Sequence, residues 1–305
     1  MAGSESSPAG AIGRLFVVGT PIGNLGDFSP RAAEAFRGAD VICCEDTRVT
    51  SKLLAHLGIS KPLMRCDENT IAARAPQLVD RILAGERVAF ASDAGMPSVS
   101  DPGQVLVDAC REAGAPVEVL PGPSACVTAL VASGIPCEHF FFEGFLPRKQ
   151  GERVRRLREL ASVPGALIFY ESPHRVADSL AAIAEVFPRR DAALCRELTK
   201  LHEEVARASA PELSQLVRDR GELRGECVIV VAPPDAAELA GMVPASCADA
   251  SAADPDAALR ADIEEALAAG EAVSSISKRL SQRYSLRKRA VYDLILVMQA
   301  DADRS

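Results

Sequence analysis

Aromatic residues and long apolar runs are scarce in this sequence. It contains no tryptophan, and aromatic residues make up 4% of the chain, which leaves few rings for stacking on nucleic-acid bases. No apolar run reaches the roughly 18 residues that a membrane-spanning helix requires. The first residues, MAGSESSPAGAIG, lack the cationic stretch of a secretory signal. We therefore expect a disordered leader over residues 1–12 and a cytoplasmic protein with no membrane partner.

A surplus of positive charge and a regular cysteine spacing are also missing. Lysine and arginine number 34 against 42 acidic residues, so the net charge is −8 and a polyanionic partner would need local basic patches. The 9 cysteines show no C-x-x-C spacing, and several lie in apolar runs such as 41–44 and 226–231. This pattern argues against a disulfide scaffold or a zinc site, and it predicts reduced, buried thiols and no bound metal.

The chain has 305 residues, which is enough for two domains, and its 48% of hydrophobic residues is typical of globular proteins. In the first half, short β-rich runs alternate with helical patterns, which predicts an α/β fold with a parallel sheet. We expect α/β domains over 13–138 and 139–234. The strands expected in them are 15–19, 40–46, 87–93 and 116–122 in the first, and 139–145, 166–172, 191–198 and 225–234 in the second. Helices are expected over 30–37 and 72–84.

The C-terminal part predicts a small helical module at 255–300, after a linker at 235–254 that is poor in large apolar residues. Asp254 and Pro255 are typical of a helix start, and Gly270 is typical of a helix stop. Two more helices follow, with apolar faces formed by Val273, Ile276 and Leu280 and by Ala290, Val291, Leu294, Ile295 and Met298. Three short helices in this arrangement resemble a helix-turn-helix.

Three loops rich in glycine and proline follow expected strands, at the sheet edge where α/β proteins bind ligands. They are GTPIGNLGD (19–27), SDAGMPSVSDPG (92–103) and PGPSA (121–125). The first loop lacks the Gly-Lys-Ser/Thr of a Walker A loop and the G-x-G-x-x-G of dinucleotide-binding domains. Glu45 and Asp46, at the end of the second strand, lend slight support to a nicotinamide dinucleotide. The second loop is about twice as long as an ordinary connector, which favours a ligand-binding role.

The sequence contains three further motifs, EDTR (45–48), FYESPHR (169–175) and RELTK (196–200). Taken in chain order, the three loops and these three motifs resemble those of the tetrapyrrole methylase superfamily. Within it, the chain is similar to the members that methylate the 2′-hydroxyl of a cytidine in 16S ribosomal RNA. The resemblance covers about residues 13–234. It implies a two-domain methylase fold, S-adenosylmethionine in a cleft between the domains, a homodimer, and the 30S ribosomal subunit as partner.

The resemblance also implies which residues line the cofactor site. Backbone groups and small side chains hold much of the cofactor in this superfamily, which suits loops of this kind. The implied residues are Pro21, Ile22, Asp93, Met96, Ser124, Ala125, Tyr170, Arg196 and Glu226.

A general base for a hydroxyl acceptor has several candidates in these motifs. The main ones are Glu45, Asp101 and Glu171, with Asp46 and His174 as further possibilities. Each has a structural alternative: a carboxylate can cap a helix or fix a loop through the backbone, and Glu171 can pair with the nearby Arg175.

Two basic segments are expected to contact RNA phosphates. Residues 147–158 carry six bases and one acid, and residues 272–300 carry six bases against Asp293. A solvated charged face is the alternative interpretation. The expected RNA-binding residues are Arg148, Lys149, Arg153, Arg155, Arg156, His174, Arg175, Lys278, Arg279, Arg287, Lys288 and Arg289.

Two other functions compete with RNA methylation. A methyltransferase of a corrin or porphyrin precursor would share the fold and the cofactor, but it has no need of the basic segment or the helical module. A non-catalytic RNA-binding assembly factor would have no need of intact cofactor loops.

Overall fold

The computed structural model describes residues 12–99, 101–242, 255–268, 271–284, 286 and 288–302. The described residues up to Pro234 form one compact unit, and those from Asp235 onward form a second. Residues 1–11 of the expected leader lie outside the described residues, as do Asp254, Gly270 and Arg287. In the range expected to be a linker, Ala236–Met242 form helix α9, and 243–254 lie outside the described residues.

The first half of the larger unit contains a five-stranded parallel sheet with the strand order β3-β2-β4-β1-β5. Its strands are β1 (Arg14–Val18), β2 (Val41–Cys44), β3 (Leu63–Arg65), β4 (Arg87–Ala91) and β5 (Val117–Leu120). The short edge strand β3 was not expected from the sequence. Its helices are α1 (Pro30–Gly38), α2 (Thr47–His56), α3 (Ile71–Leu83) and α4 (Gly103–Glu112), with the short 3-10 helix η1 at Leu25–Asp27.

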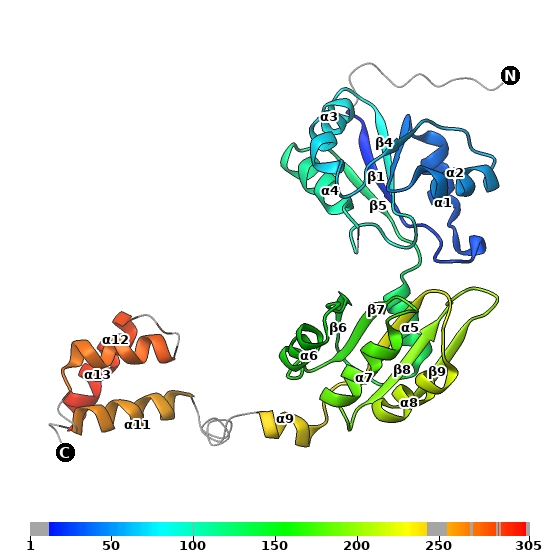
Figure 1. The fold of residues 1–305 in the computed structure, drawn as a ribbon. Helices are drawn as coiled ribbons and strands as arrows, with labels where there is room; N and C mark the ends of the chain where they lie inside the picture. The colour runs from blue at the N-terminus through cyan, green and yellow to red at the C-terminus, as the bar shows by residue number, and fades with distance from the viewer. Residues whose placement is uncertain are drawn as a thin grey trace. The chain divides into compact units, whose positions relative to one another are not determined.

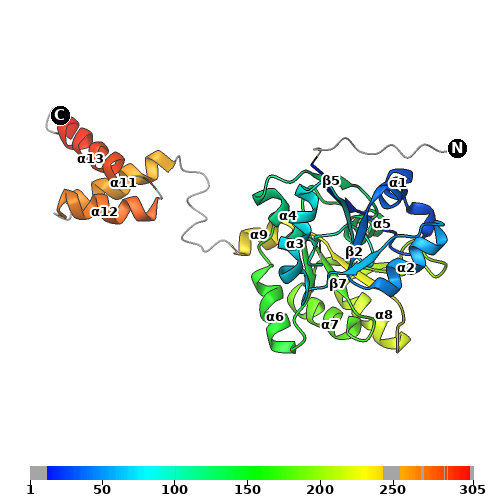
Figure 2. The ribbon, with the colours of Figure 1, turned by 90° about the horizontal axis from the view of Figure 1, so that it is seen from above.

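Helices cover both faces of this sheet. Figure 2 shows α1 and α2 on one side and α3 and α4 on the other. Alternate residues of a strand point to opposite faces, so Phe16 packs with α1 and α2 whereas Leu15 packs with α3 and α4. Burial on both faces explains why these strands are continuous apolar runs. The carboxyl ends of the strands, and the loops after them, therefore meet at one edge of the sheet.

The second half contains a mixed sheet with the strand order β6-β7-β10-β8-β9. The pair β6–β7 is parallel, and the pairs β7–β10, β10–β8 and β8–β9 are antiparallel. The strands are β6 (Phe140–Phe145), β7 (Ala166–Glu171), β8 (Asp191–Arg196), β9 (Glu204–Ser209) and β10 (Cys227–Val231). The helices are α5 (Ala125–Ser133), α6 (Gln150–Glu159), α7 (Val176–Val186) and α8 (Ala210–Arg220).

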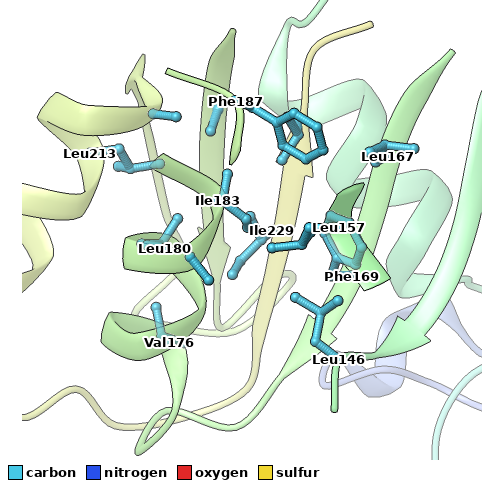
Figure 3. Packing of buried hydrophobic residues seen from close by; sticks show 14 of the residues in the cluster. Leu146, Leu157, Leu167, Phe169, Val176, Leu180, Ile183, Phe187, Leu213 and Ile229 are labelled. Carbon is cyan, nitrogen blue, oxygen red and sulfur yellow. The ribbon is translucent and has the colours of Figure 1, made fainter. Parts of the chain in front are cut away.

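Helices α6, α7 and α8 pack on one face of the second sheet. Figure 3 shows Phe169 and Ile229 from the strands against Ile183 and Leu213 from the helices. Each of these side chains is nearly fully buried, which stabilises the fold by about 1.5–3 kcal/mol per residue.

Helix α5 covers the opposite face of the second sheet. Its Cys126 and Ala129 pack with residues of β7, β8 and β10. Because α5 precedes residue 138, the boundary expected at that residue separates this helix from the sheet on which it packs. Figure 1 shows α5 directly after the crossing from the first half to the second.

The smaller unit contains α9 and a module of three helices, α11 (Pro255–Ala268), α12 (Val273–Arg283) and α13 (Lys288–Ala302). Ile263, Ile276, Leu280, Val291 and Ile295 form its buried centre. Val273, Leu294 and Met298 pack against this centre as expected, whereas Ala290 is exposed. Among the helices that the structure describes, none is long and apolar enough to cross a bilayer.

Candidate functional site

Two loops at the carboxyl edge of the first sheet are hydrogen-bonded to each other. The amide of Thr20, after β1, donates to the carbonyl of Gly95, after β4, at 2.9 Å, and the amide of Gly95 returns a bond of 3.1 Å. The loop after β5 also lies close to the loop after β1. A Cβ atom added to Gly19 would be only 2.6 Å from the backbone nitrogen of Gly122. The two glycines therefore allow an approach of backbone to backbone that no other residue permits.

A cavity of about 420 Å³ opens at this edge, between these loops and the second half. It is within the size range of small-molecule sites, which is about 300–1,000 Å³. The first half and the loop after β5 contribute Ile22, Glu45, Ser92, Asp93, Ala94, Gly95, Met96, Val99, Asp101 and Ser124. The second half contributes Ala125, Phe145, Tyr170, Glu171, Ser172, Pro173, Cys195, Leu198, Gly225, Glu226, Cys227 and Val228.

Most of the expected cofactor residues line this cavity, and two do not. Pro21 lines an adjacent cavity instead. The guanidinium of Arg196 is bound to Glu204 at 3.0 Å and to the carbonyl of Arg224 at 3.2 Å. Arg196 thus joins β8 to its neighbours, and a role in cofactor binding is not supported by its position.

An aromatic group lies in the wall that the second half provides. The rings of Phe142 and Phe145 meet Tyr170 edge-on, with centroids 4.7 and 5.9 Å from it. Burial raises the pKa of Tyr170 to about 12, so its hydroxyl stays protonated at neutral pH. Phe145, Val99 and Leu198 also line the cavity. The sequence does not single them out, because apolar residues in strands and loops usually belong to the core.

Glu45 is the half-buried carboxylate next to the end of β2. One of its oxygens, Oε1, accepts a hydrogen bond of 3.2 Å from the amide of Asp93. The other, Oε2, has no hydrogen-bond partner in the part of the chain that the structure describes. Burial is the main reason that the pKa of Glu45 is raised above its ordinary value, and the charges of Asp101 and Asp93 act in the same direction.

Asp93 lies beside Glu45 and also has a raised pKa, chiefly because of burial. Its Oδ1 accepts a hydrogen bond of 3.1 Å from the amide of Asp46. Asp46 itself caps α2 and pairs with Arg48, and these bonds lower its pKa to about 2. Asp46 therefore stays ionised, and its contacts are those of a helix cap.

Asp101 fixes the long loop in which it lies. Both of its oxygens accept hydrogen bonds of 2.9 Å from the amide of Ser98, and Oδ1 also accepts one of 2.9 Å from the amide of Gly103. Ser98 has a left-handed φ of 73°, which is rare for a residue with a side chain. The bonds to Asp101 hold this strained turn in place.

Glu171 lines the cavity, but its carboxylate is buried and both of its oxygens accept hydrogen bonds from the protein. It accepts a hydrogen bond of 2.6 Å from the Ser179 hydroxyl and one of 2.9 Å from the Ser172 amide, and Arg175 lies 3.4 Å away. These contacts hold the turn after β7, which makes Glu171 a positioning residue. His174, by contrast, is exposed and lies 3.8 Å from Glu222, outside the cavity lining.

The basic residues of α6 and its surroundings fall into two groups. Arg148, Lys149 and Arg155 are exposed. Arg153 is only 2% exposed and donates to the carbonyls of Pro147 and Arg148, so its guanidinium has little free surface to offer to RNA. Arg156 is bound to Glu143 at 2.6 Å, which commits its charge within the fold.

Arg175 is committed in the same way, because it donates to the carbonyl of Leu146 at 2.6 Å and lies near Glu171. In the helical module, Lys278, Lys288 and Arg289 are exposed, and Arg279 pairs with Glu271 at 3.0 Å. No three His, Cys, Asp or Glu side chains are grouped as metal ligands within the described ranges.

Comparison with known proteins places this architecture in a family. Residues 14–214 match the family model of the tetrapyrrole (corrin/porphyrin) methylases. The ribosomal RNA small subunit methyltransferase I of Xylella fastidiosa (strain Temecula1) is 47% identical over 232 residues, which cover 74% of this chain and 85% of that protein. The protein of the same name from Mycobacterium bovis is 41% identical, and the match covers 93% of this chain and 95% of the relative.

Solved structures share the fold at lower identity. Uroporphyrin-III C-methyltransferase from Thermus thermophilus, in complex with S-adenyl homocysteine, has a TM-score of 0.51 at 19% identity, covering 72% of this chain and 97% of that one. Diphthine synthase has a TM-score of 0.56 at 17% identity, covering 77% of this chain and 98% of its own. With its paired α/β halves and the cavity between them, the chain belongs to the tetrapyrrole methylase family.

Proposed function

We propose that the protein methylates the ribose 2′-hydroxyl of a cytidine in the 16S RNA of the small ribosomal subunit, with S-adenosylmethionine as methyl donor. The observation that carries this proposal is the cavity of about 420 Å³ at the loop edge of the first sheet, in a chain whose relatives are named ribosomal RNA small subunit methyltransferase I. The match to the Mycobacterium bovis relative covers 93% of this chain, so it extends into the range of the helical module.

The residues of the cavity fit S-adenosylmethionine. Backbone groups of Gly95 and Ser124 can meet the polar edges of the ligand, while Ile22 and Met96 offer apolar surface. When bound, the cofactor supplies an electrophilic methyl group. The chain itself must then hold the acceptor oxygen close and in line, which can contribute as much as about 7–11 kcal/mol to lowering the barrier.

We infer that Glu45 is the general base. A ribose hydroxyl is a poor nucleophile while it is protonated, and a base adds about 10²- to 10⁴-fold to the rate. Glu45 lines the cavity with one oxygen free of hydrogen bonds among the described residues, and its raised pKa makes it a better proton acceptor than an exposed carboxylate. Glu45 would accept the hydroxyl proton as the methyl group passes from the cofactor's sulfur to the ribose oxygen, and S-adenosylhomocysteine would be left. Asp101 and Glu171 have their oxygens engaged in holding loops.

The exposed bases are the proposed contacts for RNA phosphates. They are Arg148, Lys149 and Arg155 near α6, and Lys278, Lys288 and Arg289 in the helical module. A net charge of −8 repels RNA as a whole, so such local groups must supply the attraction.

We also propose a cytoplasmic homodimer. Exposed apolar side chains such as Val131, Phe140 and Phe141 offer a surface that a second copy can cover.

The decisive experiment incubates the purified protein with radiolabelled S-adenosylmethionine and 30S subunits from cells that lack the activity. We expect label in 16S RNA, and nuclease digestion with mass spectrometry should identify 2′-O-methylcytidine. Naked 16S RNA in a parallel reaction distinguishes free RNA from the assembled particle as substrate. Absence of label in spite of measurable cofactor binding would overturn the proposal, and a corrin or porphyrin precursor would then be the acceptor to test.

A further inference from the structure

A second cavity lies against α2, next to the cofactor cavity. It has a volume of about 350 Å³, and we call it the α2 pocket. Its lining consists of Thr20, Pro21, Ile22, Gly23, Leu25, Val49, Thr50, Lys52, Leu53, Ser92, Asp93, Ala94, Lys200 and Glu226. Five of these residues also line the cofactor cavity, namely Ile22, Ser92, Asp93, Ala94 and Glu226. The two cavities therefore share a wall, and a group in one is close to a group in the other.

The α2 pocket combines an apolar wall with positive charge. Leu25 and Val49 are large apolar residues that are more than a third exposed, and both line it. Lys52, one helical turn after Val49, is exposed and forms no ion pair among the described residues. An apolar surface beside a cation suits a flat, uncharged ring that is attached to an anionic group.

Lys200 provides a second cation, and it is held in place. Its Nζ atom is 2.8 Å from Glu197 and 3.1 Å from Glu226. A Cβ atom on Gly23 would lie only 2.5 Å from Cγ of Lys200, so the first loop and the RELTK segment are packed tightly together. Gly23 from the first half and Lys200 from the second half thus meet at one side of the α2 pocket.

The RELTK segment is strained just before Lys200, the residue that it contributes to the pocket lining. Glu197 and Thr199 have left-handed φ angles of 51° and 66°, which is unusual for any residue with a side chain and most of all for a β-branched one. The Oγ1 atom of Thr199 is buried without a hydrogen-bond partner. Strain of this kind clusters at functional sites.

From these features we propose that the α2 pocket receives the single acceptor nucleotide of the RNA. The ring of the pyrimidine would pack on Leu25 and Val49, and Lys52 would contact its phosphate. Proteins recognise single nucleotides of RNA by splaying the base out of the stack, and a pocket beside the cofactor cavity can hold such a base. The exocyclic amine of a cytosine is a donor for which a carboxylate such as that of Asp93 is a suitable acceptor. This inference rests on the proposed function.

Blocking the pocket tests the inference. Val49 lines the α2 pocket and is not part of the cofactor cavity lining, so Val49→Trp adds its bulk in the α2 pocket. Val105→Trp, on α4, is the control because Val105 is about as exposed as Val49 and lines neither cavity. With 30S subunits and labelled S-adenosylmethionine, we expect Val49→Trp to lose at least about 100-fold in methylation rate. Its affinity for S-adenosylmethionine, measured by calorimetry, should stay within about twofold of wild type, and Val105→Trp should behave as wild type.

A second variant keeps the test valid if the tryptophan disturbs folding. Lys52→Ala should raise KM for 30S subunits, leave cofactor affinity unchanged, and reduce the slope of log affinity against log salt by about one. Lys61→Ala, in the loop between α2 and β3, serves as its control. Full methylation by both pocket variants would overturn the α2 pocket as acceptor site. Failure of the wild-type protein to methylate 16S RNA would instead overturn the proposed function on which it rests.

Discussion

The Oε1 atom of Glu45 accepts a hydrogen bond from the backbone amide of Asp93 at 3.2 Å, which ties the end of β2 to the loop after β4. These strands are neighbours in the sheet, so the bond spans adjacent carboxyl ends. It orients one carboxylate oxygen of Glu45, a residue that lines the cavity. The same bond lowers the pKa of Glu45, but burial and the charges of Asp101 and Asp93 outweigh it.

Replacing Glu45 with glutamine should remove the base and keep the shape of the site. We expect turnover with 30S subunits to fall by about 10²- to 10⁴-fold, with S-adenosylmethionine affinity unchanged. Asp101→Asn is the comparison, because its effect should come through loop order and so weaken cofactor binding as well. Equal turnover of Glu45→Gln and wild type would exclude this carboxylate as the base.

The pH dependence of the rate follows from the direction of the Glu45 pKa shift. A base is active only when it is deprotonated, so the rate should be full above the raised pKa and fall as the pH decreases through it. The inflection should therefore lie at a higher pH than an ordinary glutamate, about 4.3, would give. A profile of kcat measured in Glu45→Gln should lack this inflection, and its persistence there would assign it to another group.

Glu171 should be needed for stability more than for chemistry. Glu171→Gln cannot satisfy Ser179, the Ser172 amide and Arg175 together, and it leaves a mostly buried guanidinium without its counter-charge. We expect the free energy of unfolding to decrease by about 2–4 kcal/mol, measured by urea denaturation. The folded variant should retain turnover within about tenfold of wild type. A loss of turnover comparable to that of Glu45→Gln, at unchanged stability, would contradict this assignment.

The close approach of Gly19 to Gly122 makes a simple test of the cofactor cavity. Gly19→Ala places a methyl group 2.6 Å from a backbone nitrogen, so the loops must separate at a cost of about 1–3 kcal/mol. Cofactor affinity should decrease along with thermal stability. Gly151→Ala, at the start of α6, is the matched control, since nothing lies within 4 Å of the added methyl group and alanine favours a helix. Unchanged calorimetric affinity in Gly19→Ala would show that this loop contact does not shape the site.

Removal of residues 245–305 tests the helical module. The truncated protein should bind S-adenosylmethionine as the full chain does, because the cavity lies entirely in residues up to Val228. Its affinity for 16S RNA should decrease, and the dependence of that affinity on salt should become shallower as phosphate contacts are lost. Filter binding at several salt concentrations measures both effects. Equal RNA affinity of the two proteins would refute a role for the module in RNA binding.

The sequence allowed prediction of much of the first half because its signals are local. The apolar runs of β1, β2, β4 and β5 stand out against polar loops, and the family motifs fall in the loops that line the cavity. Strand β3, with three residues and little burial, is too short for such a signal. The mixed order of the second sheet depends on long-range pairing, which hydrophobic periodicity does not reveal.

Charge patterns were less informative, and α6 shows why. Its arginines are close together in the sequence and cannot be told apart by pattern alone. In the structure, Arg153 lies on the buried face with Val154 and Leu157, whereas Arg155 is exposed to solvent. Arg156 meets Glu143, which lies on a neighbouring strand and not on the same helix. Which bases are available to a ligand is therefore decided by tertiary contacts. The same holds for the α2 pocket, whose two lysines are far apart in the chain.

Helix α5 belongs by packing to the second sheet, although it follows directly on the last strand of the first. The division between the halves thus falls within the loop 121–124, and a fragment that ended at residue 138 would carry Cys126 and Ala129 with no surface to bury them. The same loop contributes Ser124 to the cofactor cavity. If the chain were cut at this loop, each of the two fragments would carry one side of the cofactor cavity. We therefore expect the cofactor to promote association of the two fragments.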